Sequence, residues 1–145
     1  MATAHPLRVG LIGAGGRWGP WAHVPALQGV AEAELYAVCT AHADTAQAAA
    51  QKFGVQHAYG DIGGLCSDPQ VEAALVAVRV PAHYALSKAS LEAGKHVFCE
   101  WPLGKDTQEA EQLAALARAN KLQAMVGLQR RASPAYLYMR ELIRD

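Results

Sequence analysis

The residues with the clearest chemical potential follow the first apolar run of the chain. Gly13, Gly15 and Gly16 stand directly after a run that ends at Ile12. Glycines permit a tight turn and let main-chain N–H groups approach a pyrophosphate, which the start of a following helix attracts. Gly13 and Gly15 fit the first two positions of Gly-x-Gly-x-x-Gly, whereas Trp18 occupies the third. We therefore predict a dinucleotide site here, the alternative being a tight turn without a ligand.

The exit of the second predicted strand bears on the choice of cofactor. An acidic residue that binds the adenosine ribose normally lies about 20 residues after the glycines. Here the strand leads into Thr40, Ala41 and His42 and carries no carboxylate at its exit. Its absence removes the repulsion that rejects a 2′-phosphate, so we predict NADP, with NAD as the alternative. Thr40, His42 and Arg17 are then the candidates around the phosphate, unless they are ordinary loop residues or solvated side chains.

Further candidates stand at the end of the fourth apolar run. Val78 and Arg79 lie where ligands of open α/β sheets bind, and His83 follows in the first turn of the next helix. A charged residue inside an apolar run costs free energy unless its charged group reaches solvent or is paired. Arg79 is therefore expected to face the ligand or to reach solvent. His83 is expected to line the same crevice or to hydrogen-bond the backbone.

The last candidates follow the fifth and sixth apolar runs. Glu100 offers a carboxylate beside the cofactor ribose or nicotinamide, and Trp101 offers a stacking face. The alternative for Trp101 is a place in a core or an interface. Gln129, with Arg130 and Arg131, follows the last run and supplies either polar contacts to a ligand or a basic surface pair.

Alternating apolar runs and helical patterns must position these residues. The predicted strands are Leu7–Ile12, Leu35–Cys39, Val55–Tyr59, Ala73–Val80, His96–Glu100 and Leu122–Leu128. The first predicted helix starts at Trp18–Pro20 and is interrupted at Pro25, and the second is capped by Asp44 and ends at Phe53. A third helix runs from Pro81 to Ala93. A fourth has an Asp106/Glu109 capping box and runs to Asn120, and the last extends from Pro134 to Ile143. Continuous apolar strands that alternate with helices predict an α/β fold, a Rossmann-type doubly wound parallel sheet.

Composition limits the possible partners. The chain of 145 residues has the length of one domain, and its 13 Lys and Arg balance 13 Asp and Glu. The sequence has no basic run of the kind that indicates direct nucleic-acid binding. Cys39, Cys66 and Cys99 have no disulfide or zinc-site spacing, so no metal is predicted and a reducing, cytoplasmic setting fits best. The first apolar run breaks at Gly13, too early for a signal peptide or a membrane span.

Together these residues resemble the glucose–fructose oxidoreductase / inositol dehydrogenase / MocA family of NAD(P)-dependent oxidoreductases. The landmarks are the glycine turn followed by His23 and Ala26-Leu27, then Pro81-Ala82-His83, Glu-x-Pro-Leu at 100–103, Val126-Gly127 before Gln129-Arg130-Arg131, and Arg140-Glu141-Leu142-Ile143. The resemblance implies a dinucleotide as small-molecule partner and hydride transfer to or from a carbohydrate-like alcohol or carbonyl.

The sequence departs from the family at one functional position. Typical members carry a catalytic lysine between the glutamate and the proline, where this chain has Trp101, so the catalytic residue is left unassigned. Trp101, Val78-Arg79-Val80 and Leu128-Gln129 are similar to a subgroup that includes the yeast galactose-regulon repressor. The resemblance thus also allows a non-catalytic NADP-binding regulator or sensor that acts through a protein partner.

The resemblance also bears on domain organisation. Family members continue into an α+β domain that supplies the substrate pocket and often mediates oligomerisation. It implies that residues 1–145 are the NAD(P)-binding domain of a longer protein, since Asp145 stands where that second domain begins. We expect this part alone to be inactive, and an oligomer remains possible.

Overall fold

The computed structural model describes residues 5–144, which build a parallel sheet of six strands in the order β3-β2-β1-β4-β5-β6. The strands are β1 (Leu7–Ile12), β2 (Ala33–Cys39), β3 (His57–Tyr59), β4 (Ala73–Val76), β5 (His96–Glu100) and β6 (Ala124–Gly127). Every neighbouring pair runs parallel, which places all carboxyl ends at one edge. The predicted doubly wound α/β fold is confirmed.

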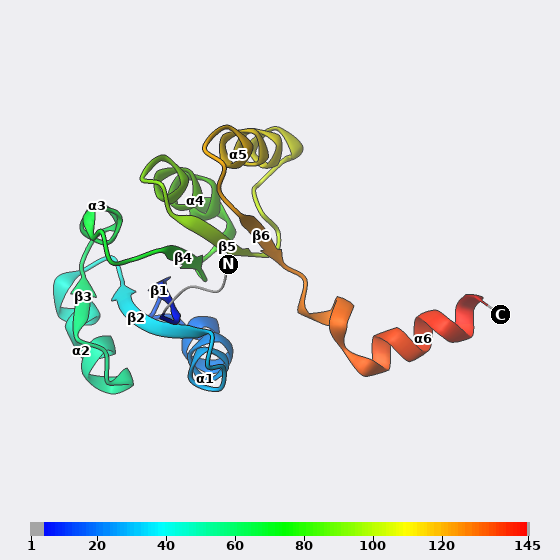
Figure 1. Cartoon of the computed structure of the whole chain (residues 1–145), viewed down its shortest axis with the longest axis horizontal. Helices are drawn as coiled ribbons and strands as arrows, with labels where there is room; N and C mark the ends of the chain where they lie inside the picture. The colour runs from blue at the N-terminus through cyan, green and yellow to red at the C-terminus, as the bar shows by residue number, and fades with distance from the viewer. Residues whose placement is uncertain (1–4, 145) are drawn as a thin grey trace.

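Helices cover both faces of the sheet (Figure 1). The five α-helices that pack near the sheet are α1 (Val24–Gln28), α2 (Ala43–Phe53), α3 (Ile62–Ser67), α4 (His83–Glu92) and α5 (Thr107–Ala119). Short helical segments of other kinds are η1 (Gly19–His23), η2 (Val80–Ala82) and η3 (Gln129–Ala132). The last helix, α6 (Pro134–Arg144), extends away from the sheet and has no buried residue.

Two apolar cores form because successive strand residues point to opposite faces. Val9 and Leu11 of β1 pack with Val24 of α1 and with alanines of α2. On the other face, Ile12 belongs to the core that contains Leu65 of α3, with Leu91 and Leu113 of the next helices. Strand β4 is buried along its whole length and contributes to both cores. The continuous apolar runs therefore mark strands covered on both sides, as predicted.

Strand β1 lies at the point where the strand order reverses. It pairs with β2 on one side and with β4 on the other, so the chain leaves β1 in one direction and later returns to its opposite side. In doubly wound sheets the connections after the two strands then diverge, and a crevice opens at their carboxyl ends. The glycine turn follows β1 directly at that crevice.

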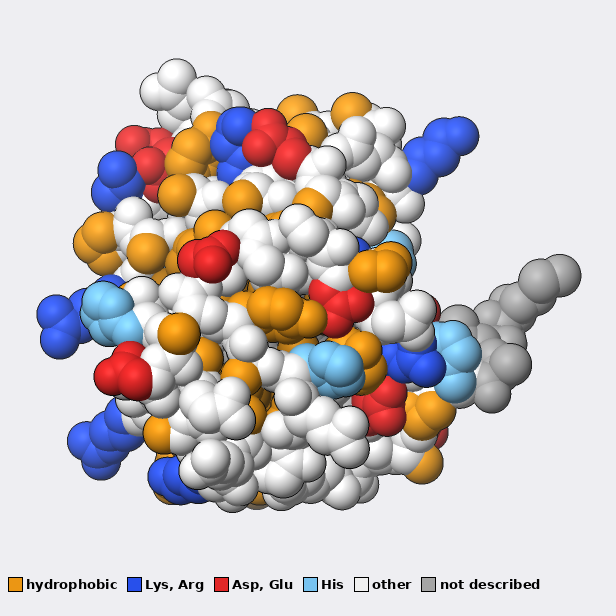
Figure 2. Space-filling view, turned by 90° about the vertical axis from the view of Figure 1, so that its left-hand side faces the viewer, with side chains coloured by type: hydrophobic (Ala, Val, Ile, Leu, Met, Phe, Trp, Pro, Cys, Tyr) orange, Lys and Arg blue, Asp and Glu red, His pale blue; other side chains and the backbone are white. Residues whose placement is uncertain are grey.

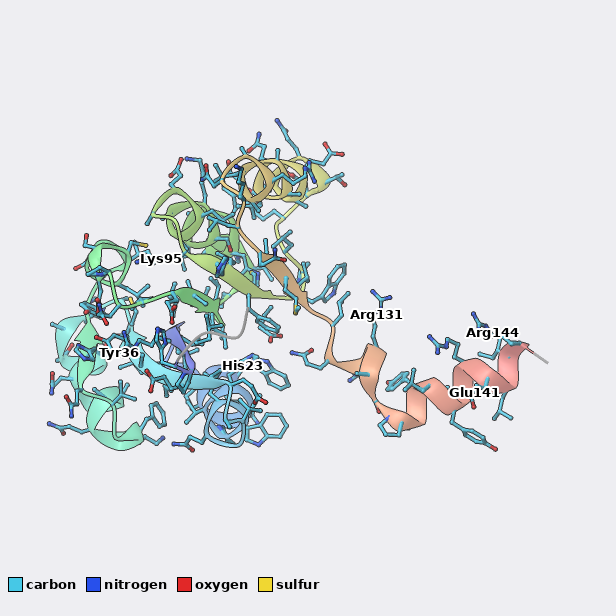
Figure 3. The ribbon with its side chains drawn as sticks, viewed as in Figure 1. His23, Tyr36, Lys95, Arg131, Glu141 and Arg144 are labelled. Carbon is cyan, nitrogen blue, oxygen red and sulfur yellow. The ribbon has the colours of Figure 1, made fainter. Side chains whose placement is uncertain are left out.

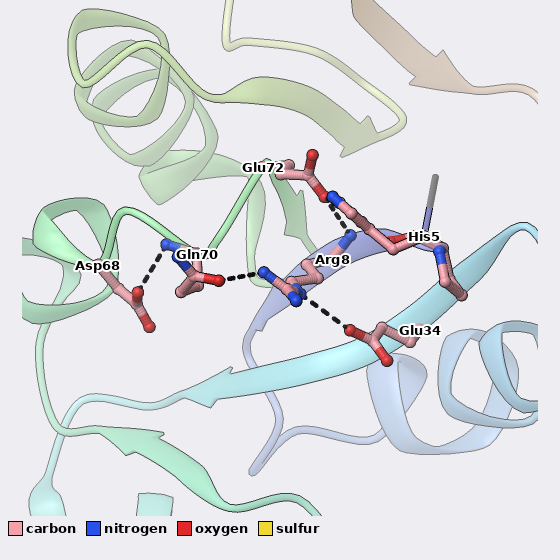
Figure 4. Close-up of polar contacts among 7 residues, drawn as sticks. His5, Arg8, Glu34, Asp68, Gln70 and Glu72 are labelled. Carbon is pink, nitrogen blue, oxygen red and sulfur yellow. Dashed lines mark hydrogen bonds and ion pairs between the residues drawn. The ribbon is translucent and has the colours of Figure 1, made fainter. Parts of the chain in front are cut away.

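Polar side chains tie the amino ends of the strands together (Figure 4). The Nε of Arg8 lies 3.2 Å from Oε1 of Glu34, and its Nη1 also donates to Gln70. The main-chain N–H of Arg8 donates to Oε2 of Glu72 at 2.9 Å. Asp68 accepts from the N–H of Gln70 at 2.8 Å. This network joins β1, β2 and the loop before β4 at the edge opposite the crevice.

Charge is distributed without segregation on the face at the β3 side of the molecule. Figure 2 shows acidic and basic side chains interspersed there, with hydrophobic side chains between them. The pattern agrees with the balance of charged residues in the sequence. Within residues 5–144, no helix combines the length and hydropathy that crossing a bilayer requires.

Several strand limits differ from the sequence prediction. Strand β4 ends at Val76, not at Val80. Its partner β1 ends at Ile12, so pairing stops soon afterwards, and η2 begins at Val80. Strand β3 begins at His57 because the N–H of Val55 bonds back to α2. In the same way, β6 begins at Ala124, since Leu122 still bonds to the end of α5, and β2 begins two residues earlier than predicted.

The helix starts also need correction. Asp44 does not cap α2: His42 occupies the N-cap position and Asp44 lies in the first turn, where a carboxylate still favours the helix. Pro25 does not interrupt its helix, because it stands in the first turn of α1, where its missing N–H costs little. Pro81 lies in η2, ahead of α4. Asp106 caps α5 as predicted.

One further helix was absent from the prediction. Helix α3 was missed, although Asp61 caps it by accepting from the N–H of Gly64 at 2.8 Å.

The capping box predicted at the start of α5 forms only in part. Asp106 caps the helix, but Glu109 accepts from the N–H of Lys105 instead of that of Asp106.

Candidate functional site

The turn after β1 requires glycine at its first position. Gly13 has a φ of +98°, a conformation that side chains rarely adopt. A Cβ on Gly13 would lie 2.4 Å from the carbonyl oxygen of Ala77, in the segment after β4. The turn is closed by a hydrogen bond of 2.9 Å from the N–H of Gly16 to the oxygen of Gly13. Gly13 thus lets the ends of β1 and β4 approach each other.

Gly15 leaves room for a ligand instead. It is exposed, and the nearest neighbour of a Cβ at this position would be Cγ2 of Thr40 at 3.5 Å. Among residues 5–144, its main-chain N–H has no hydrogen-bond acceptor. An exposed donor without a side chain in front of it is what close approach of an anionic ligand needs.

A hollow of about 630 Å³ extends from this turn along the carboxyl edge. We call it the glycine-turn hollow; it is lined by Ile12, Gly13, Gly15, Gly16, Cys39, Thr40, Ala41, Thr45, Gly60, Asp61, Ile62, Ala77, Val78, Ala82 and Leu86. The lining comes from the loops after β1, β2, β3 and β4, and therefore lies at the switch point of the sheet. Its size suits a small organic ligand.

Hydroxyl groups, with no carboxylate among them, occupy the exit of β2. Thr40 Oγ1 lies 2.8 Å from the carbonyl oxygen of His42 and 2.7 Å from Oγ1 of Thr45. Thr45 Oγ1 donates to the same carbonyl at 2.9 Å. The nearest carboxylate lining this hollow belongs to Asp61, whose Oδ1 caps α3. The absence of an acidic residue directly after β2, read from the sequence, is therefore also a feature of the hollow.

The cysteine in this hollow is buried and has a raised pKa. Cys39 is buried at the end of β2, and its Sγ lies 3.3 Å from the carbonyl oxygen of Asp61. Burial, together with the carboxylate of Asp61, raises the pKa of the Cys39 thiol to about 11. A nucleophilic cysteine needs a lowered pKa, so this thiol stays protonated.

A second hollow, of about 520 Å³, continues the first along the same edge. We call it the tryptophan hollow; it is lined by Trp18, Ala77, Val78, Arg79, Val80, Pro81, His83, Glu100 and Trp101. Val78 and Ala77 line both hollows, so the two adjoin. Arg79 is exposed, and its side chain has no hydrogen-bond or ion-pair partner within residues 5–144.

His83 holds two segments of this edge together. Its ring is buried, with 1% of its surface exposed. Nδ1 lies 2.7 Å from the carbonyl oxygen of Pro102, and Nε2 lies 3.0 Å from that of Val78. Both ring nitrogens thus face the backbone, one after β4 and the other after β5. Both outcomes expected for His83 apply, because it lines the hollow and contacts the backbone.

Glu100 is fixed by neighbours from distant parts of the chain. Its Oε1 lies 2.6 Å from Nε2 of His23, in η1, and accepts from Nε2 of Gln129 at 2.8 Å. The His23 ring also meets Phe98 edge to face. A Cβ on Gly127 would lie 2.9 Å from the same carboxylate oxygen, so glycine leaves room for this arrangement. The contacts hold the carboxylate between the tryptophan hollow and the end of β6.

A third hollow, of about 420 Å³, lies on the far side of Glu100. We call it the arginine hollow; it is lined by Trp18, Glu100, Trp101, Gly127, Leu128, Gln129, Arg130 and Arg131. Trp101 is 67% exposed, so it fills no core within the described residues. Trp18, Glu100 and Trp101 line both this hollow and the tryptophan hollow.

The structure thus gathers most of the predicted site residues along one edge. Gly13, Gly15, Gly16, Thr40 and Val78 line the first hollow, and Val78, Arg79, His83, Glu100, Trp101, Trp18 and Gln129 line the next two. Arg17 and His42 line none of the three, and both are exposed. Their roles toward a cofactor stay predictions.

Sequence reasoning assigned no site role to two residues of this edge. Asp61 follows β3, and the argument that placed candidates after the other strands would have found it there. His23 contacts Glu100 from a helical segment 77 positions earlier, and no spacing in the sequence indicates that pair. Among the described residues, no cluster of three or more His, Cys, Asp or Glu side chains is placed to hold a metal ion.

Known proteins share both the sequence and the structure of this chain. The dehydrogenase aclE of Aspergillus oryzae is 38% identical over 114 residues, which cover 77% of this chain and 31% of that protein. The inositol 2-dehydrogenase/D-chiro-inositol 3-dehydrogenase of Lactiplantibacillus plantarum is 32% identical over 147 residues and is covered to 42% of its length. The chain therefore spans less than half of these relatives.

A solved structure with a similar fold is that of KijD10, a 3-ketoreductase from Actinomadura kijaniata in complex with NADP and TDP-benzene. It superimposes with a TM-score of 0.90 at 28% identity and covers 97% of this chain and 42% of that protein. The family described as "Oxidoreductase family, NAD-binding Rossmann fold" matches residues 7–128. That match spans the glycine turn and all six strands, so the chain belongs to this oxidoreductase family as its NAD-binding Rossmann domain.

Proposed function

We propose that the chain binds NADP, with NAD as the alternative, along the carboxyl edge of its sheet. The glycine turn carries this proposal, because Gly13 lets the ends of β1 and β4 approach each other, and Gly15 lines the glycine-turn hollow with an N–H unpaired among the described residues and no side chain. The adenosine part then occupies that hollow, and the nicotinamide reaches the tryptophan hollow beside Glu100. NADP in the complex of KijD10 supports this reading.

The exit of β2 favours NADP over NAD. Thr40 and Thr45 place neutral hydroxyls there instead of a carboxylate, and His42 and Arg17 are exposed, so we assign these two side chains to the 2′-phosphate. Asp61 is the one carboxylate that lines the hollow, and its Oδ1 already accepts from the N–H of Gly64. A fluorescence titration with NADPH and NADH tests the preference: tighter binding of NADPH supports it, and a clear preference for NADH overturns it.

In the complete protein we assign hydride transfer to or from a carbohydrate-like alcohol or carbonyl. Relatives that are inositol dehydrogenases, and a 3-ketoreductase of similar fold, support this class of reaction. The bound cofactor supplies the hydride chemistry, whereas the protein orients it and surrounds the substrate. In this chain Glu100, held by His23 and Gln129, lies where it can orient the nicotinamide end.

A second candidate function is a sensor that binds the dinucleotide without turning it over. It is favoured by Trp101, which stands where the family resemblance places a catalytic lysine. An indole carries no group that transfers a proton to a substrate oxygen. The similarity to the yeast galactose-regulon repressor subgroup belongs to this proposal, and so does action through a protein partner.

Turnover by the complete protein separates the two functions. Oxidation or reduction of a sugar or polyol in the presence of NADP(H) supports the enzyme. Binding of NADPH without turnover of any member of a broad panel, and without activity in the Trp101→Lys variant, supports the sensor. We expect residues 1–145 alone to be inactive, and measurable turnover by this part would contradict that expectation.

A further inference from the structure

The arginine hollow presents two functional groups that nothing else in the described residues uses. The indole of Trp101 is 67% exposed at one wall. The side chain of Arg131, also in the lining, has no hydrogen-bond or ion-pair partner within residues 5–144. Figure 3 shows Arg131 on the segment between β6 and α6, with its side chain clear of the ribbon.

The other charged side chains of this hollow have partners within the described residues. Arg130 donates to the hydroxyl of Tyr136 at 3.0 Å and lies over the same ring at 5.7 Å. Glu100 Oε1 is bound by His23 and Gln129. Among the charged side chains of the hollow, Arg131 is therefore the one without a partner in the described residues, and the exposed indole of Trp101 lines the same hollow.

These two groups select for a particular chemistry. A guanidinium presents its N–H donors in a planar fork that matches the oxygens of a carboxylate or a phosphate. An exposed indole offers a flat face to a ring of similar size. A volume of about 420 Å³ accommodates one ring with a substituent, within the range of ordinary ligand sites.

We propose that the arginine hollow binds the substrate of this site as a ring-shaped alcohol or carbonyl compound that carries an anionic group, with the ring on Trp101 and the anion on Arg131. The proposal rests on the proposed function, because it takes the tryptophan hollow as the place of the nicotinamide. It goes further in naming the charge of the substrate and the residue that selects it. Neutral sugars leave Arg131 without a partner and bind more weakly.

Three ligands with the same ring isolate the charge. D-glucose, D-glucuronate and D-glucose 6-phosphate differ at the sixth carbon alone. Each is titrated into the chain already saturated with NADPH, with the indole nitrogens labelled with ¹⁵N. The chain has 3 tryptophans, so the indole N–H signals are assigned with Trp→Phe variants. Trp21 lines none of the three hollows, and its ring lies 5.1 Å from that of Trp18, so its signal is expected to respond less than that of Trp101.

We expect the signal of Trp101 to shift with glucuronate or glucose 6-phosphate at about one tenth of the concentration that glucose requires, in keeping with a charge-assisted hydrogen bond to an exposed guanidinium. Preference for glucuronate identifies a carboxylate, and preference for glucose 6-phosphate identifies a phosphate. Either preference supports the proposal, provided that the signal of Trp101 shifts more than that of Trp21.

Matched variants assign the effect to its residues. Arg131→Gln is expected to bring the three ligands to within about twofold of one another, because the anion loses its partner. Arg140→Gln removes the same charge from α6, outside the three hollows, and is expected to keep the preference. Trp101→Leu lacks the Trp101 signal, so binding is followed through the indole N–H of Trp18, which lines the same hollow, and all three ligands are expected to weaken alike. A circular dichroism spectrum checks that each variant is folded.

The outcomes separate this inference from the proposed function. Saturation with NADPH followed by equal binding of the three ligands, or by no binding, overturns the inference and leaves the proposed function intact. Loss of the preference in both arginine variants overturns the assignment to Arg131. Failure of NADPH to bind in the first step overturns the proposed function and the inference with it.

Discussion

Replacing Gly13 by alanine tests how the cofactor edge is built. The residue adopts a φ of +98°, and strain at such an angle costs a residue with a Cβ about 1 to 2 kcal/mol. The new Cβ would also lie 2.4 Å from the oxygen of Ala77 and 2.9 Å from Cγ1 of Val78. Relief of this overlap needs a backbone shift that costs about 1 to 3 kcal/mol more. We therefore expect Gly13→Ala to lower the free energy of unfolding by about 2 to 5 kcal/mol.

Two other glycines provide matched controls for this variant. Gly54 ends α2 with a φ of +69°, but a Cβ added there would have no atom within 4 Å. Gly54→Ala therefore introduces the same kind of backbone strain as Gly13→Ala without the steric overlap. It is expected to cost about 1 kcal/mol. Gly15→Ala meets its first neighbour, Cγ2 of Thr40, at 3.5 Å and should leave stability unchanged, yet weaken NADPH binding by adding a methyl group to the lining of the hollow.

Urea unfolding followed by circular dichroism measures the three stabilities, and NADPH fluorescence measures binding. We expect Gly13→Ala to be the least stable of the three variants. We expect Gly15→Ala to keep its stability but to bind NADPH more weakly. Equal stabilities of Gly13→Ala and Gly54→Ala would refute the argument that contact with Ala77 fixes the first glycine. Unchanged NADPH affinity in Gly15→Ala would refute the role given to its N–H.

The remaining predictions concern the core and the groups around the site. His83→Ala removes a buried ring that contacts the carbonyls of Val78 and Pro102. It should lower the free energy of unfolding in urea by about 2 to 4 kcal/mol and weaken NADPH binding. A variant as stable as the parent would contradict the role of His83 in holding these two segments together. Burial raises the pKa of the Cys39 and Cys99 thiols to about 11, above the value of about 8.5 in the unfolded chain. The unfolded chain therefore loses these protons first, so the free energy of unfolding should fall between about pH 9 and pH 11, less steeply in a double alanine variant. Leu113→Ala, at a position 2% exposed, should cost about 2 to 5 kcal/mol by urea unfolding, and a loss below about 1 kcal/mol would contradict its place in the core.

The sequence was most informative where local chemistry decides the structure. Continuous apolar runs identified strands buried on both faces, and the glycine turn placed the site after the first of them. The order of the six strands was not predicted, because it depends on pairings between distant segments. Helix α3 escaped prediction since its sequence, Ile62–Ser67, has two glycines and no helical apolar pattern.

Element boundaries depended on partners that the sequence does not show. The apolar run through Val80 continues beyond β4, but β1 has already ended and pairing stops. Asp44 fits a cap by residue type, whereas the N-cap is His42, so the helix starts two positions earlier. Pro25 was predicted to interrupt a helix, because nothing in the sequence indicates that a separate short segment, η1, precedes it.

The site was predictable to the extent that parallel strands end at one edge. That rule brought Thr40, Arg79, Glu100 and Gln129 into the candidate set, and the structure places all four along the hollows. It did not give the contact of His23 with Glu100, which joins positions 77 residues apart. Side-chain pairing of this kind follows from packing and becomes visible in the structure alone.

The most direct test of the account is a crystal structure of the chain grown with NADPH. The account predicts the pyrophosphate against the turn at Gly13 to Gly16, within hydrogen-bond distance of the N–H of Gly15, and the nicotinamide in the tryptophan hollow beside Glu100. NADPH bound at another part of the surface, or a nicotinamide directed away from Trp101, would contradict the central claim.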